Sequence, residues 1–186
     1  MKKDNKGFTL VELVVVIAMA SIFIGIFVLN IGQITGYNAK ECYKKVQSAI
    51  TAEKINTLGK AKYTGERYLQ IYRNTADDRI YVQTVTNANT PGVTATVEDK
   101  TKLTKRSGVK IGYELSNGLK VDDVTNVTED SLKLKICFNR ATGAMVNLDP
   151  PNYTTSTLKY IYITAGSHKY TIEFEPRTGK VINAER

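Results

Sequence analysis

The 186-residue sequence has little from which to build an active site or a metal centre. It contains one histidine, His168, and two cysteines, and these do not form the Cys/His spacing of a zinc site. A nucleophile elbow and a glycine-rich phosphate loop are also missing from the sequence. Three acidic pairs lack the loop of a calcium site and are predicted to be solvated turns: Asp77-Asp78, Asp122-Asp123 and Glu129-Asp130. We therefore expect no enzyme, no cofactor and no metal.

Proline is missing from the first ninety residues, and basic residues are missing from the stretch between Phe8 and Tyr37. The first proline is Pro91, and the stretch contains no lysine, arginine or histidine. The weakest helix formers in this part are three glycines, Gly25, Gly32 and Gly36. We expect one long helix over roughly residues 9–58, gently curved, with these glycines as its weak points.

One carboxylate, Glu12, lies inside the apolar part of this helix. The run from Phe8 to Leu29 would be about 33 Å long as a helix, enough to cross a hydrocarbon core. An acid near the middle of a membrane costs roughly 2.5–3.5 kcal/mol, so it should have a partner. The helix offers none, and we expect the partner to come from elsewhere.

The flanks of the run favour an anchor over a cleaved secretory signal. Lys2, Lys3 and Lys6 precede it, which predicts a cytoplasmic N-terminus and an exported C-terminal part. Ala18-Met19-Ala20 mimics a signal cleavage site, but the apolar run continues beyond it. A plain signal anchor is the simpler alternative, although it explains neither Glu12 nor Gly7 at the polar boundary.

The stretch Lys6-Gly7-Phe8-Thr9-Leu10-Val11-Glu12-Leu13 resembles the N-terminal signature of type IV pilins and of the pseudopilins of secretion and competence systems. The resemblance covers about the first thirty residues. It implies that a prepilin peptidase cuts between Gly7 and Phe8 and N-methylates Phe8. Many pilins carry a proline near the position of Leu29, and this chain has none there.

The same resemblance implies a role for Glu12 in assembly. Cleavage would create an α-amino cation at Phe8, and Glu12 of an incoming subunit could pair with the Phe8 amine of a docked subunit. The implied partners are other subunits, the prepilin peptidase, an assembly platform protein in the cytoplasmic membrane and a separate assembly ATPase.

Beyond the apolar run we predict an α+β protein. The expected organisation is a leader at 1–7, a helix at 8–59 with a transmembrane part at 8–29, and a β-rich exported domain at 60–186. The second half of the helix is amphipathic and should pack on an antiparallel sheet, as in a pilin fold.

Period-two patterns predict the strands. We expect a hairpin from 68–72 and 80–85, and a second from 109–115 and 119–121 around an Asn-Gly turn. Strands are also expected at 132–138, 158–163 and 170–174, while 86–107 is predicted to be a long surface excursion.

The last third contains an internal echo. The pattern Ile136-x-Phe138-x₃-Thr142-Gly143 recurs as Ile172-x-Phe174-x₃-Thr178-Gly179. Each copy predicts a strand, a glycine-containing turn and a short return strand. The closing segment 176–181 also resembles, more loosely, the end of H-type minor pseudopilins, which favours a minor subunit.

Two further groups leave alternatives open. Cys42 and Cys137 could form a disulfide in an exported domain, but two small buried side chains are the favoured interpretation. The densest basic cluster is a candidate DNA contact, with a solubilising loop as the favoured alternative: Lys100, Lys102, Lys105, Arg106 and Lys110.

We therefore predict a structural subunit of a pilus or pseudopilus that starts in the cytoplasmic membrane and ends in a surface or periplasmic filament. The sequence does not decide among type IV pilus, competence and secretion systems. The main alternative is a membrane-tethered module that binds a ligand or DNA.

Overall fold

The fold is known from a computed structural model of residues 1–186. It describes residues 9–59, 66–88, 92, 94–104, 108–124, 134–146, 157–175 and 177–184. The chain divides into two compact units, residues 1–34 and residues 35–186, which are treated separately below. The predicted boundary at residue 59/60 therefore stays a prediction.

A single long helix, α1 (Leu10–Gly59), belongs to both units. It continues without a break through the three glycines that the sequence marked as weak points. In the second unit its buried positions recur every three or four residues, which is the spacing of one helix face: Ala39, Cys42, Tyr43, Val46 and Ile50. The amphipathic pattern thus gives α1 one apolar face, which packs into the core of the second unit.

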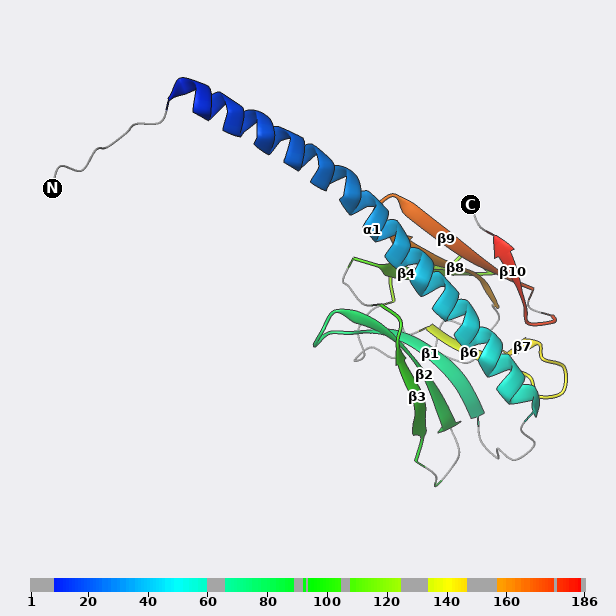
Figure 1. Ribbon diagram of the computed structural model, residues 1–186. Helices are drawn as coiled ribbons and strands as arrows, with labels where there is room; N and C mark the ends of the chain where they lie inside the picture. The colour runs from blue at the N-terminus through cyan, green and yellow to red at the C-terminus, as the bar shows by residue number, and fades with distance from the viewer. Residues whose placement is uncertain are drawn as a thin grey trace. The chain divides into compact units, whose positions relative to one another are not determined.

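Two five-stranded antiparallel sheets complete the second unit (Figure 1). The first has the order β3-β2-β1-β6-β7 and contains β1 (Glu66–Asn74), β2 (Arg79–Ala88), β3 (Thr96–Lys102), β6 (Leu134–Phe138) and β7 (Met145–Val146). The second has the order β10-β9-β8-β4-β5 and contains β4 (Lys110–Leu115), β5 (Lys120–Val121), β8 (Leu158–Ala165), β9 (His168–Glu175) and β10 (Lys180–Ala184). The α+β class is confirmed, with two sheets where one was expected.

One core unites these elements. Its buried side chains come from α1 and from both sheets, and alternate residues of β6 and β8 face it. Ile71, Ile136 and Ile161 are examples that are at most 1% exposed. Burying each such side chain contributes about 1.5–3 kcal/mol, so the core holds the described parts of residues 35–186 as one body.

The prediction of a surface excursion over 86–107 is wrong in its middle part. β2 continues to Ala88, and β3 pairs with it from Thr96 to Lys102. β3 is an edge strand whose side chains are almost all exposed, so it has no apolar alternation to detect. Asp99, with φ of 50°, lies where the register with β2 shifts.

The predicted turns and strands of the internal echo are confirmed. Gly143 and Gly179 both have positive φ, and each amide donates to a carbonyl four residues earlier, at 2.8 Å. The two turns also meet, because a Cβ on Gly179 would fall on the carbonyl oxygen of Gly143 and against the ring of Phe138. The repeated glycines therefore allow two hairpins from different sheets to touch.

We expect Gly179→Ala to lower the free energy of unfolding by about 3 kcal/mol, since it adds a backbone collision to the cost of the left-handed conformation. Urea unfolding of the full chain in detergent micelles measures this. Gly118→Ala is the matched control: Gly118 has φ of 87° with no atom within 4 Å of its Cβ position, and should lose only about 1 kcal/mol. Equal losses would contradict the contact between the turns.

Candidate functional site: the start of the long helix

The first described residues form a capping box. Thr9 precedes α1, and its backbone amide and hydroxyl both donate to Oε2 of Glu12, at 2.9 and 2.8 Å. In return, the Glu12 amide donates to Oγ1 of Thr9 at 3.2 Å. This reciprocal pattern satisfies two backbone donors that a helix start otherwise leaves free. Glu12 is therefore part of the start signal of the helix.

The capping box adds to one sequence inference. Glu12 was expected to find no cation on its own helix, and the structure gives it two hydrogen bonds from Thr9. Both donors are neutral, so the charge of Glu12 is not balanced by a cation there. The signal was present in the sequence as Thr9-x-x-Glu12 before an apolar run. Gly7 and Phe8, the predicted processing residues, lie outside the described residues.

The rest of this unit is a helix with apolar side chains on all sides. Every described side chain from Thr9 to Ile26 is exposed, and Leu10, Ile22 and Phe23 are 78%, 65% and 64% exposed. A helix that is apolar on all sides is stable only against other apolar material. Within the described residues, no helix combines the length and the hydropathy that a membrane span needs.

A comparison with known protein families identifies a sequence motif in this segment. A family model for the prokaryotic N-terminal methylation motif matches residues 2–28. The match covers the N-terminal segment only, and it supports a type IV pilin- or pseudopilin-like start of the chain. The chain matches no curated protein and no solved structure. The motif implies association with other pilin subunits and with the prepilin peptidase, and an anchored protein that later joins a surface filament.

The two cysteines are not joined in a disulfide. Cys42 is in the core with 0% exposure, and burial raises the pKa of its thiol to about 12. Cys137 lies between two inward-facing residues of β6, and its Sγ donates to the carbonyl of Arg67 at 3.0 Å. Strand alternation turns Cys137 away from the core that holds Cys42, so the structure contradicts a disulfide between them.

The candidate DNA cluster is divided. Lys100 and Lys102 lie with Nζ 4.9 and 5.6 Å from the ring centroid of Tyr81, beside the first sheet. Lys110 belongs to β4 of the second sheet. Lys105 and Arg106 lie outside the described residues. The described members thus belong to two different sheets, and DNA contact stays a prediction.

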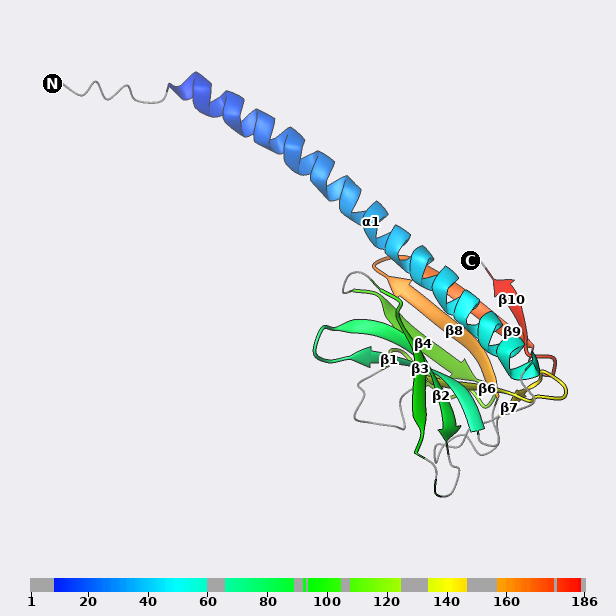
Figure 2. The same ribbon diagram turned by 60° about the horizontal axis from the view of Figure 1, so that its bottom comes forward.

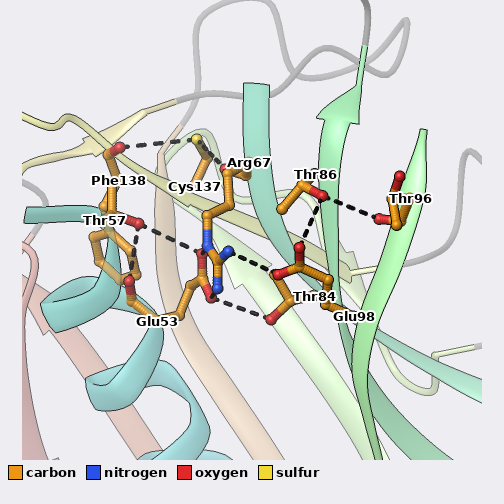
Figure 3. Close-up of polar contacts among 9 residues, drawn as sticks. All are labelled: Glu53, Thr57, Arg67, Thr84, Thr86, Thr96, Glu98, Cys137 and Phe138. Atoms are coloured by element: carbon orange, nitrogen blue, oxygen red, sulfur yellow. Dashed lines mark hydrogen bonds and ion pairs between the residues drawn. The ribbon is translucent and has the colours of Figure 1, made fainter. Parts of the chain in front are cut away.

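A buried ion pair that the sequence did not indicate joins α1 to the first sheet (Figure 3). Glu53 and Arg67 are 3% and 6% exposed, and Nε and Nη2 of Arg67 donate to the two carboxylate oxygens of Glu53 at 2.7 and 3.2 Å. Thr84 donates to Glu53 at 3.2 Å, and Nη1 of Arg67 reaches Glu98 at 3.1 Å. The two bonds between the guanidinium and the carboxylate, together with the hydrogen bonds that involve Thr84 and Glu98, give the geometry that a buried ion pair requires.

The pKa of Arg67 reflects this environment. Burial disfavours its charge, but its bonds to Glu53 and Glu98 hold the pKa of the guanidinium above its usual value. Sequence reasoning missed the pair because the two residues belong to different elements, and neither spacing nor periodicity links them.

A pocket of about 310 Å³ lies beside this ion pair, between α1 and strands β1–β3. Apolar side chains of Leu69, Val82 and Leu103 line it together with Glu53 and Thr84. Five further polar side chains complete the lining: Lys45, Ser48, Asn56, Asp99 and Thr101. Glu53 is already paired with Arg67, and Lys45 is paired with Glu41.

Proposed function

We propose that the chain is a minor structural subunit of a type IV pilus or of a related pseudopilus. A prepilin peptidase cleaves it between Gly7 and Phe8 and methylates the new amine of Phe8. Before assembly, the run from Phe8 to Leu29 inserts into the cytoplasmic membrane with the domain outside. The observation that carries this proposal is the methylation motif at residues 2–28, with one acid in an apolar helix.

The capping box supports a precursor whose helix is ready before processing. The Thr9 amide that binds Glu12 belongs to the peptide bond between Phe8 and Thr9, so cleavage after Gly7 leaves it in place. The helix start therefore survives maturation, while the Phe8 amine becomes available four residues before Glu12. In a filament, the carboxylate exchanges neutral donors for the cation of a neighbouring subunit.

The proposal that the chain is a minor subunit rests on the C-terminal hairpin. β9 and β10 pair from Lys180 opposite Glu175 to Ala184 opposite Thr171. This hairpin carries the segment that resembles the end of H-type minor pseudopilins. The assembly platform, the separate ATPase and the choice among pilus, competence and secretion systems belong to the same proposal.

Intact mass analysis of the chain, purified after co-expression with a prepilin peptidase, tests processing. We expect loss of residues 1–7 and one added methyl group on Phe8. Co-expression with an inactive peptidase is the control and should leave the precursor mass. Residues 1–7 retained in the presence of active peptidase would support the alternative, a tethered binding module.

A further inference from the structure

The turn between β8 and β9 is fixed against the first helical residues of the second unit (Figure 2). A Cβ on Gly36 would lie 2.8 Å from the ring of His168, and a Cβ on Gly166 would lie 3.6 Å from Oγ1 of Thr35. Two turns further along α1, Tyr43 packs on Tyr170 with ring centroids 5.7 Å apart. The turn therefore marks one end of the domain, where the chain enters from residue 34.

Exposed basic side chains gather at this end. Lys110, Thr164 and Lys169 are direct neighbours across β4, β8 and β9, and their partners in register place them on one face of the sheet. Neighbouring strands are about 4.8 Å apart, so the two lysines stand roughly 10 Å from each other. On α1, Lys40 is exposed and Tyr37 is 69% exposed. We call Tyr37, Lys40, Lys110, His168 and Lys169 the basic rim.

Three acids near the rim bind cations outside it, and Glu114, on the same sheet face as Lys110, accepts a hydrogen bond from the hydroxyl of Tyr162. Asp78 and Asp123 both bind Arg73, at 3.1 and 3.0 Å, and Glu41 binds Lys45 at 3.1 Å. Within the described part of the chain, the lysines of the rim form no ion pair. Lys169 instead has its Nζ 4.1 Å from the ring centroid of Tyr162. The rim therefore presents positive charge to an outside partner.

The chain length limits how far the rim can be from lipid once the apolar run is inserted. Tyr37 is only eight positions after Leu29 in the sequence. This length of chain spans about 12 Å as a helix, and no more than about 28 Å if fully extended. A headgroup layer is roughly 5–7 Å thick and charge acts over about 10 Å beyond it. Tyrosine and lysine are also the side chains that favour this layer.

We propose that the basic rim binds anionic lipid headgroups on the outer surface of the cytoplasmic membrane before the subunit is assembled. This inference rests on the proposed insertion of residues 8–29. Docking holds the domain against the surface, and assembly into a filament removes it from the lipid. Each lysine near an anionic surface favours the docked state about fivefold, and three lysines favour it about a hundredfold.

The chain contains no tryptophan, so one added tryptophan is a clean reporter. Ser167→Trp places it in the exposed β8–β9 turn. The full chain is reconstituted in vesicles of phosphatidylcholine alone, or of an equal mixture with phosphatidylglycerol, each with a headgroup spin label. We expect strong quenching only in the mixture, weakened by high salt.

Two triple variants in the reporter background separate the rim from net charge. Lys40→Gln, Lys110→Gln and Lys169→Gln together should lower the ratio of docked to free domain about a hundredfold. Lys100→Gln, Lys159→Gln and Lys180→Gln remove the same charge from exposed positions elsewhere and should leave quenching nearly unchanged. If Ser167→Trp does not fold, Tyr37→Trp carries the same measurement.

Equal quenching in both kinds of vesicle, or an equal loss of quenching in both triple variants, would overturn the proposal. Emission that responds to a DNA oligonucleotide and not to phosphatidylglycerol would also overturn it, and would assign the rim to nucleic acid. Flotation of the vesicles checks the underlying function separately: a chain that does not float is not inserted, and then the proposed anchor itself is wrong.

Discussion

We expect Glu12→Gln to reduce incorporation of the chain into filaments roughly a hundredfold, since an unmatched charge in lipid costs roughly 2.5–3.5 kcal/mol. Glutamine keeps the side-chain oxygen that Thr9 binds and can serve in the same capping box. The variant therefore loses the charge of residue 12 and keeps the helix start. The Phe8 amine of a docked neighbour would then have no counterion. The measurement is the amount of this subunit in sheared, purified filaments relative to its amount in membranes.

Thr9→Ala is the matched control for that experiment. It removes the hydroxyl that shares the capping box and costs about 1 kcal/mol of helix stability, but it keeps the carboxylate. We expect this variant to assemble at close to the normal level. The opposite ranking, with Glu12→Gln assembled and Thr9→Ala lost, would show that Glu12 acts only as a cap.

The second large effect concerns the buried ion pair. Arg67→Ala should lower the free energy of unfolding by about 3–5 kcal/mol, because it leaves the 3% exposed carboxylate of Glu53 without its cation. Urea unfolding of the full chain in micelles measures the loss. The core around the pair is otherwise unchanged, so the effect reports on the charge.

Two variants control for this prediction. Lys45→Ala breaks a partly exposed pair with Glu41 on α1 and should cost no more than about 0.5 kcal/mol. Replacing both Glu53 and Arg67 with leucine should recover much of the loss, because no charge is then left buried alone. A loss below about 1 kcal/mol for Arg67→Ala would contradict a desolvated pair.

Much of the fold followed from local patterns. The helix over Leu10–Gly59 follows from apolar periodicity without proline, and its core face recurs at the expected positions. The hairpin of β4 and β5 follows from the Asn-Gly turn, since Gly118 adopts the positive φ that the turn requires. The internal echo around Gly143 and Gly179 was predictable for the same reason, because both glycines adopt the positive φ of a turn.

Other features could not be seen because they depend on pairing between distant segments. β3 is polar and hydrogen-bonded on one side only, so its sequence matches a loop. The division into two sheets depends on which strands pair, as when β1 takes β6 and β4 takes β8. Alternation of apolar residues predicts which face of a strand is buried, but it does not determine which strand pairs with it.

The candidate site was predictable where its residues form a local motif. The methylation motif matches residues 2–28, and the capping box of Thr9 and Glu12 lies within that range. The pair of Glu53 and Arg67 was not predictable, because burial and not sequence spacing selects it.

The pairing of Glu12 with a neighbour's Phe8 amine is tested most directly by zero-length carboxylate–amine cross-linking of assembled filaments. In the mature chain, the tryptic peptide from Phe8 to Lys40 contains one acid, Glu12, and its amines are the Phe8 terminus and Lys40. A link through Lys40 would block cleavage there, so the short peptide joined through Glu12 to the N-terminal peptide of a neighbouring subunit identifies the pair. We predict this joined peptide from filaments and its absence from Glu12→Gln filaments. Filaments that yield only single peptides, under conditions that cross-link other contacts, would contradict the account.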